Sequence, residues 1–170
     1  MQILRKGMPW RPYFIRLTVL AFIMAMVGTY AMMRYRIGID TQQERCLPDT
    51  TVYLIDLWDQ EPVRDGLYAF HSKGLAPLYN DGTRMLKRLT GMPSDEVNVT
   101  SERVLVNGVE VSTGMALAQR LGVAESHFSR SLTLQENEYW FSGEAATSFD
   151  SRYWSTVKRE QILGRAWPLW

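Results

Sequence analysis

Two reactive side chains, Lys87 and Cys46, lie in surroundings that could support catalysis. Lys87 follows the apolar pair Met85-Leu86 and comes just before a Gly-Met-Pro turn, so we expect it on or beside a strand end, half withdrawn from water. Burial disfavours the ammonium form of a lysine, and a neutral amine can act as a general base for a hydroxyl or thiol nucleophile. The alternative is a lysine whose stem covers an apolar strand while its charge stays in water.

Cys46 is the single cysteine of the chain, which excludes an intramolecular disulfide and a zinc site built from cysteines. It is either a nucleophile, because a thiolate is intrinsically reactive, or a small apolar filler. The chain has two histidines, His71 and His127, and we expect both at the surface. The residues therefore predict neither a metal site nor a cofactor.

Length and charge restrict the classes of function. The chain has 170 residues, enough for one membrane anchor and one domain. Its formal net charge is +1 with 22% charged residues, so it lacks the strongly basic surface of a nucleic-acid-binding protein. We therefore expect no nucleic-acid partner.

An apolar segment near the N-terminus predicts a membrane anchor. Leu17 to Met33 is a run of 17 residues without a charge, and extending it gives a transmembrane helix over residues 13–34. Basic residues precede it, which places residues 1–12 in the cytoplasm, although Arg34 and Arg36 weaken this asymmetry. The alternative is a cleaved signal peptide ending near Thr29-Tyr30-Ala31.

Residues 35–170 predict one mostly β domain, a coiled antiparallel sheet or small barrel. We expect a polar connector over residues 35–44, a hairpin turn at Asn107-Gly108 and a short helix over residues 114–121. The expected strands are rich in β-branched and aromatic residues: 51–58, 67–71, the lysine strand before Gly91, 97–100, 103–106, 109–111, 132–134, 139–141 and 161–166.

Three ordered motifs resemble those of the type I signal peptidases. Leu86-Lys87-Arg88-Leu-Thr-Gly91-Met92-Pro93-Ser94-Asp95-Glu96-Val97 resembles the lysine box of that family, and Ser148-Phe-Asp150-Ser151-Arg152-Tyr153-Trp154 resembles its C-terminal box. Cys46-Leu47-Pro48 lies where the family carries its nucleophile. The short length and the Cys-Leu-Pro form are most similar to the peptidases of conjugative-transfer systems, which process pilins.

The resemblance implies a role for each matched residue. Cys46 would be the nucleophile in place of the family's serine, and Lys87 would be the base. Ser148 would hydrogen-bond the lysine amine, while Asp150 and Arg152, placed two apart on one strand face, would form a structural salt bridge. Glu44 stands where many members carry a serine that donates to the oxyanion, so the backbone N–H of Cys46 would serve there instead.

The implied function is a membrane-anchored endopeptidase whose catalytic domain lies in the periplasm, outside the inner membrane of a bacterium. Its partners would be the lipid of that membrane and signal peptides or pilin precursors with small residues one and three positions before the cut. Two alternatives stay open: an inactive homologue that binds or scaffolds pilus or secretion components, and a transpeptidase that joins the two ends of a pilin. The oligomeric state does not follow from the residues.

Overall fold

The computed structural model describes residues 10–40, 47 and 50–170. Within it the chain forms two compact units, Met1–Tyr35 and Arg36–Trp170.

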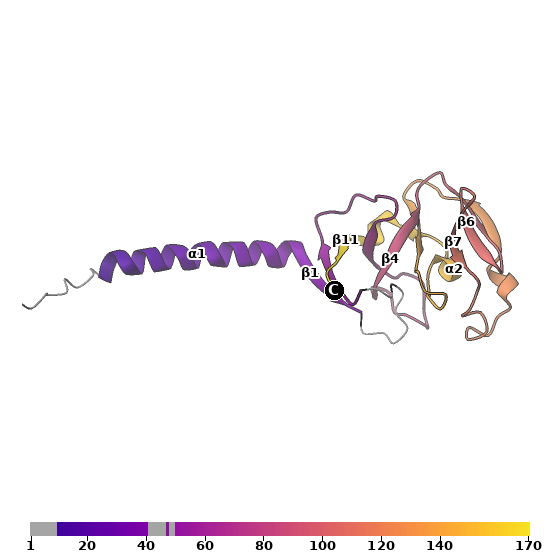
Figure 1. The fold of residues 1–170 in the computed structure, drawn as a ribbon, viewed down its shortest axis with the longest axis horizontal. Helices are drawn as coiled ribbons and strands as arrows, with labels where there is room; N and C mark the ends of the chain where they lie inside the picture. The colour runs from indigo at the N-terminus through magenta and orange to yellow at the C-terminus, as the bar shows by residue number, and fades with distance from the viewer. Residues whose placement is uncertain (1–9, 41–46, 48–49) are drawn as a thin grey trace, which may run out of the picture. The chain divides into compact units, whose positions relative to one another are not determined.

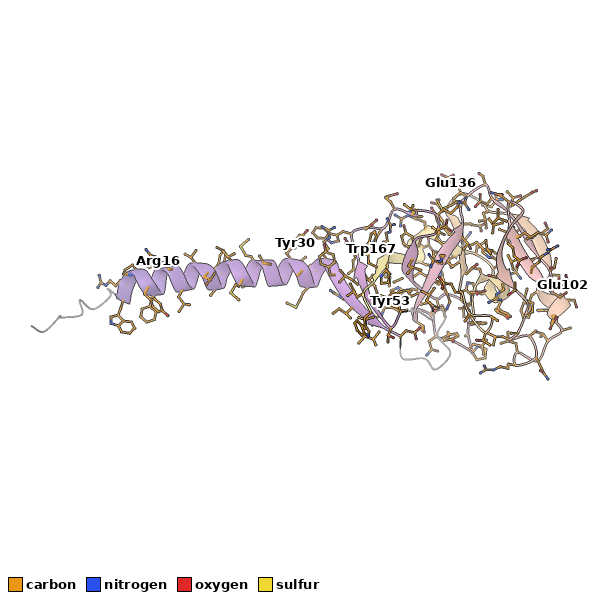
Figure 2. The ribbon with its side chains drawn as sticks, in the orientation of Figure 1. Arg16, Tyr30, Tyr53, Glu102, Glu136 and Trp167 are labelled. Carbon is orange, nitrogen blue, oxygen red and sulfur yellow. The ribbon has the colours of Figure 1, made fainter. Side chains whose placement is uncertain are left out.

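The first unit contains one long helix, α1 (Trp10–Arg34). Helix α1 begins at Trp10, three residues before the predicted start at residue 13. Pro12 allows this because it lies in the first turn, where a backbone N–H would have no hydrogen-bond partner within the helix. No residue of α1 is buried, and side chains such as Arg16 and Tyr30 project away from its axis (Figure 2). Its 25 residues have a mean hydropathy of 1.8 in the most apolar window, which suffices by length and composition to cross a membrane.

The second unit consists of two antiparallel sheets (Figure 1). The larger sheet has the strand order β1-β2-β11-β3-β4-β9-β10, and the smaller has the order β7-β6-β5-β8. The strands are β1 (Tyr35–Ile39), β2 (Val52–Asp56), β3 (Leu67–His71), β4 (Arg84–Gly91), β5 (Glu96–Val99), β6 (Arg103–Val106), β7 (Val109–Thr113), β8 (Arg130–Thr133), β9 (Glu138–Ser142), β10 (Val157–Lys158) and β11 (Ile162–Pro168). Short helices join some of them: η1 (Glu125–Phe128), α2 (Ser151–Trp154) and η2 (Arg159–Gln161).

The mostly β prediction is confirmed, but the small barrel is wrong. Among the described strands, β1 and β10 stand at opposite edges of the larger sheet, and β7 and β8 at opposite edges of the smaller one. A barrel requires its first and last strands to pair, and neither sheet closes in this way. The domain is therefore built from two open sheets.

Two further predictions are wrong. Residues 35–39 form β1 rather than a polar connector, since Ile37 and Ile39 favour a strand and Gly38 lets it approach β2, where a Cβ would lie 3.3 Å from Ile55 Cδ1. Residues 114–121 form a series of turns rather than a helix. The cause is tertiary, because Met115, Leu117 and Ala118 are all buried, which no single helical stripe would allow.

The hairpin prediction at Asn107-Gly108 is confirmed. Both residues have positive φ, 49° and 79°, and Val106 and Val109 pair directly across the turn. These are the angles of a type I′ turn, whose twist matches the two strands it joins. The turn fixes the register of β6 and β7.

Apolar clusters cover both faces of the larger sheet. Met85 and Leu89 of β4 pack on one face with Tyr68, Phe70 and Phe141. On the other face, Leu86 packs against a cluster made of Leu47, Tyr53, Ile55, Ala69 and Ala166. A third cluster lies under the smaller sheet and includes Trp140 of β9. Strand β4 is thus enclosed from both sides, which explains how it can bury a lysine.

Candidate active site

Lys87 lies in the middle of β4 and is 5% exposed. It stands opposite Tyr68 of β3, and strand alternation places it on the same face as Met85 and Leu89. The prediction of a lysine withdrawn from water is confirmed. Its side chain is buried more deeply than the sequence alone indicates, because the face of β4 that carries it packs in the apolar cluster with Tyr68, Phe70 and Phe141.

Strand β4 loses one neighbour at the position of Lys87. Its pairing with β9 runs from Gly91↔Trp140 to Arg88↔Ser142 and ends there, while its pairing with β3 continues to Arg84. Among the described strands, none continues the ladder beside residues 84–87 on the β9 side. An extended peptide could pair with this free edge of β4.

The nucleophile candidate Cys46 and the neighbouring Glu44 lie outside the described residues. Leu47, which follows Cys46, is described and is 5% exposed. It packs in the apolar cluster that also receives Leu86, the residue before Lys87. The chain next to Cys46 is therefore held against the same strand that carries the lysine.

Ser148 is 1% exposed, and its Oγ has no hydrogen-bond partner among the described residues. The predicted bond from Ser148 to the amine of Lys87 is therefore not formed in this structure. The backbone N–H of Ser148 donates to Ala145 O at 3.0 Å, which fixes the loop that follows β9. A buried hydroxyl without a partner is unfavourable, so Ser148 Oγ can accept a further donor.

Asp150 and Arg152 form a buried salt bridge, as predicted, with 2.8 Å between Oδ1 and Nε. They do not share a strand face: Asp150 caps the N-terminus of α2 and accepts the backbone N–H of Arg152 at 3.1 Å. An aspartate suits this position because it satisfies an amide at the helix start. The family motif predicts the pair, whereas the local strand assignment is wrong.

The guanidinium of Arg152 joins three segments. Its Nη1 donates to Thr113 O at 2.7 Å and to Gly114 O at 3.1 Å, at the end of β7. Its Nη2 donates to Asp150 Oδ2 at 2.9 Å and to Ser148 O at 3.2 Å. Figure 1 shows α2 near β7, in agreement with these bonds. Arg152 thus holds the Ser148 segment in place.

The turn after the lysine strand is fixed by Asp95, which is 6% exposed. Asp95 accepts the Met92 N–H at 2.6 Å, the Asn107 amide at 2.7 Å and the Arg64 guanidinium at 2.8 Å. Burial by itself raises the pKa of Asp95, but the bonds from Met92, Arg64 and Asn107 outweigh it and hold that pKa below its ordinary value of 3.8.

Sequence reasoning missed two ion pairs around the site. Arg64 reaches Asp95 from another loop, and Arg88, the residue after Lys87, pairs with Glu144 in the loop after β9. Arg88 Nη1 also donates to Asp65 O at 2.8 Å. No local pattern in the sequence marked either pair.

The residues His, Cys, Asp and Glu could in principle bind a metal. Within the part of the chain that the structure describes, no three of them cluster in a way that could hold an ion.

Comparison with known proteins identifies the family. Residues 10–170 match the family model described as signal peptidase, peptidase S26. A probable signal peptidase I-2 from Synechocystis sp. is 29% identical over 115 residues, which is 65% of this chain and 50% of that protein. A signal peptidase I from Leptolyngbya laminosa is 29% identical over 119 residues, 64% of this chain and 54% of that protein. A crystal structure of a signal peptidase I from Enterococcus faecalis has 26% identity and a TM-score of 0.40, with 63% of this chain and 97% of that chain covered.

The chain belongs to the signal peptidase family, peptidase S26. It spans about half the length of the two curated relatives. The resemblance read from the three sequence motifs is therefore confirmed at the level of the family.

Proposed function

We propose that this protein is a membrane-anchored endopeptidase that cleaves signal peptides from exported precursor proteins. The observation that carries the proposal is the burial of Lys87 at the point where β4 loses its neighbour β9. A lysine in this position has a dry environment suited to a base, and an open strand edge at which a substrate can lie. Family membership supports the same reaction.

The proposed reaction uses Cys46 as the nucleophile and Lys87 as the base. Cys46 Sγ attacks the carbonyl carbon of the scissile peptide, and its proton passes to Lys87. The C–N bond then breaks, the leaving amine takes the proton from Lys87, and a thioester on Cys46 remains. Lys87 next accepts a proton from water as that water attacks the thioester. The C–S bond then breaks and the proton passes from Lys87 to Cys46 Sγ, which releases the signal peptide and regenerates the thiol and the neutral amine.

The substrate would pair as an extended strand with residues 84–87 of β4. Leu86 lies on the face of β4 that carries the apolar cluster with Ala69 and Leu47, so small apolar residues before the cut would suit this face. Exported precursors are the proposed substrate class, with pilin subunits of a conjugative system as the finer assignment. The domain would act in the periplasm, tethered by α1 to the inner membrane.

Peptide cleavage by the full chain in detergent micelles tests this proposal. A peptide with Ala-Xaa-Ala before the cut should be cleaved by the wild type. Lys87→Arg should lower kcat/KM by about 10²–10⁴-fold, because a guanidinium stays protonated and cannot accept the proton. Lys73→Arg is the matched control, since Lys73 is exposed and distant in sequence from the site, and it should cleave like the wild type.

The products distinguish the alternatives. If the wild type binds the peptide without cleaving it, the protein is an inactive homologue and the proposal is wrong. If the main product is lighter than the hydrolysed fragment by one water, the enzyme is a transpeptidase that closes a ring. If Lys87→Arg kept full activity, Lys87 would not be the base, and its side chain would contribute to packing alone.

A further inference from the structure

A cavity of about 300 Å³ lies between the two sheets, on the face of β4 that carries Arg88 and Thr90. Its walls include Arg88 and Thr90 of β4, Ser142 of β9 and Glu110 and Ser112 of β7. Unlike the residues of the apolar clusters on the larger sheet, eight of the twelve residues that line this cavity carry a charge or a hydroxyl. Such a lining suits a polar ligand.

Two residues of the cavity wall, Arg88 and Ala145, lie close in the chain to the site residues Lys87 and Ser148. Arg88 directly follows Lys87, and Ala145, another wall residue, accepts the backbone N–H of Ser148 at 3.0 Å. Strand alternation places Leu86, Arg88 and Thr90 on one face of β4. Along this face the surface changes from apolar at Leu86 to polar at Arg88.

The free edge of β4 ends where the cavity begins. Pairing with β9 starts at Arg88↔Ser142, and both of these residues line the cavity. A peptide strand beside residues 84–87 cannot continue along β4 past this point, because β9 occupies the edge. Its next residues must leave the sheet, and the cavity is the adjoining space.

One hydroxyl of the cavity wall lacks a hydrogen-bond partner among the described residues. Thr90 Oγ1 and Ser142 Oγ bond each other at 2.9 Å, whereas Ser112 Oγ, although shielded from water, has no partner among the described residues. A ligand that bonds to this hydroxyl would remove an unfavourable unpaired group.

One carboxylate of the cavity is weakly engaged. Arg88 is paired with Glu144, and Arg152 is paired with Asp150. Glu110 has Arg103 Nη1 at 3.9 Å, and both side chains are about half exposed. At that distance the contact is not a hydrogen bond, so Glu110 can accept bonds from a basic ligand group.

We propose that this cavity binds the residues that follow the cleavage site of the precursor and favours a basic side chain there. The inference rests on the proposed function and deepens it, because it assigns specificity to the mature side of the substrate. Small apolar residues before the cut would lie at Leu86, and the first or second residue after the cut would extend its side chain towards Glu110 and Ser112.

The test compares peptides that share Ala-Xaa-Ala before the cut and carry Lys, Glu or Ala at the first and second positions after it. The full chain in detergent micelles should cleave the Lys peptides with a kcat/KM about fivefold above the Glu peptides, the upper range for a partly exposed ion pair. Glu110→Lys should reverse this preference, so that the Glu peptides are cleaved with a higher kcat/KM than the Lys peptides. Glu102→Lys is the matched control: Glu102 is exposed in the turn between β5 and β6 (labelled in Figure 2), does not line the cavity, and should keep the wild-type preference.

Ser112→Leu provides a second, independent variant because it fills the cavity without a change of charge. It should lower kcat/KM for the Lys and Glu peptides together, relative to the Ala peptide. The inference would be overturned if the wild type, Glu110→Lys and Ser112→Leu all cleaved the Lys, Glu and Ala peptides in the same ratios. Because the Ala peptide would still be cleaved, the proposed function would remain intact. Absence of cleavage of every peptide by the folded wild type would overturn both.

Discussion

Lys87 and Ser148 are both buried polar residues. Lys87 is 5% exposed on an apolar face of β4, and Ser148 Oγ has no hydrogen-bond partner among the described residues. Stable packing alone does not favour such an arrangement, because unpaired buried polar groups cost free energy. The burial of Lys87 agrees with the role of base that we propose for it.

Asp95 gives a prediction of pH dependence at the residue scale. Its folded pKa lies below the ordinary value of 3.8, since the bonds from Met92, Arg64 and Asn107 outweigh the effect of burial. The stability that it contributes is therefore fully present above about pH 3.8 and is lost as the pH falls through the lower folded pKa.

Asp95→Asn should remove this contribution. We expect it to lower the free energy of unfolding by about 1–3 kcal/mol at pH 6, and by less at pH 2.5, because below the ordinary pKa of 3.8 the unfolded state binds the proton and the contribution of the ionised carboxylate shrinks. Denaturant titrations of the full chain at the two pH values measure the difference. If Asp95→Asn lowered the free energy of unfolding equally at both pH values, the ionised carboxylate of Asp95 would not be the group that stabilises the turn.

The site residues differ in how far the sequence could reveal them. Lys87 and the Asp150–Arg152 pair stand in ordered motifs, so their identity and the salt bridge could be predicted. Arg64 could not, because it meets Asp95 across a sequence separation of 31 residues and no local pattern marks a guanidinium as a partner of a distant turn.

Elements with a local cause were predicted well, and those with a tertiary cause were not. The turn at Asn107-Gly108 follows from two residues that tolerate positive φ, and β3 begins and ends as the prediction for residues 67–71, with the aromatic residues Tyr68 and Phe70, indicates. The turns of residues 114–121 and the short helix α2 depend instead on burial and on Arg152, which bonds to Gly114 O. Propensity carries no information about such contacts.

Helix α2 gives the prediction at the element scale. Arg152→Met should leave Asp150 as an uncompensated buried charge and release the carbonyls of Thr113, Gly114 and Ser148. The expected cost is about 3–5 kcal/mol of unfolding free energy. Arg103→Met, at an exposed ion pair in the smaller sheet, should cost less than about 1 kcal/mol.

Denaturant titration of the two variants in detergent micelles measures this difference. If Asp150→Leu combined with Arg152→Met recovers much of the loss, the cost of the single change came from the unpaired carboxylate. Equal stabilities of Arg152→Met and Arg103→Met would show that the buried pair does not hold α2.

At the scale of the whole molecule, the sequence predicts an apolar helix followed by a mostly β domain, and both are present. The closure of the sheet could not be predicted, because short strands with turns between them are common to barrels and to open sheets. Pairing between distant strands, such as β11 inserted between β2 and β3, decides the architecture.

Topology gives the prediction at this scale. Arg11 and Arg16 lie at the start of α1, and Arg5 and Lys6 precede it, so the positive-inside rule places this end in the cytoplasm. A reporter that is active only outside the cytoplasm should be active when it is fused after Trp170. Activity of a cytoplasmic reporter at the same position would contradict both the orientation and the proposed class of substrate.

Mass spectrometry of an acid-quenched cleavage reaction tests the central claim most directly. The proposed mechanism predicts the acyl part of an Ala-Xaa-Ala peptide on Cys46 of the wild type, with neither adduct nor cleavage in Cys46→Ala. Full cleavage by Cys46→Ala would contradict it and transfer the role of nucleophile to another residue, with Ser94 and Ser142 the next candidates.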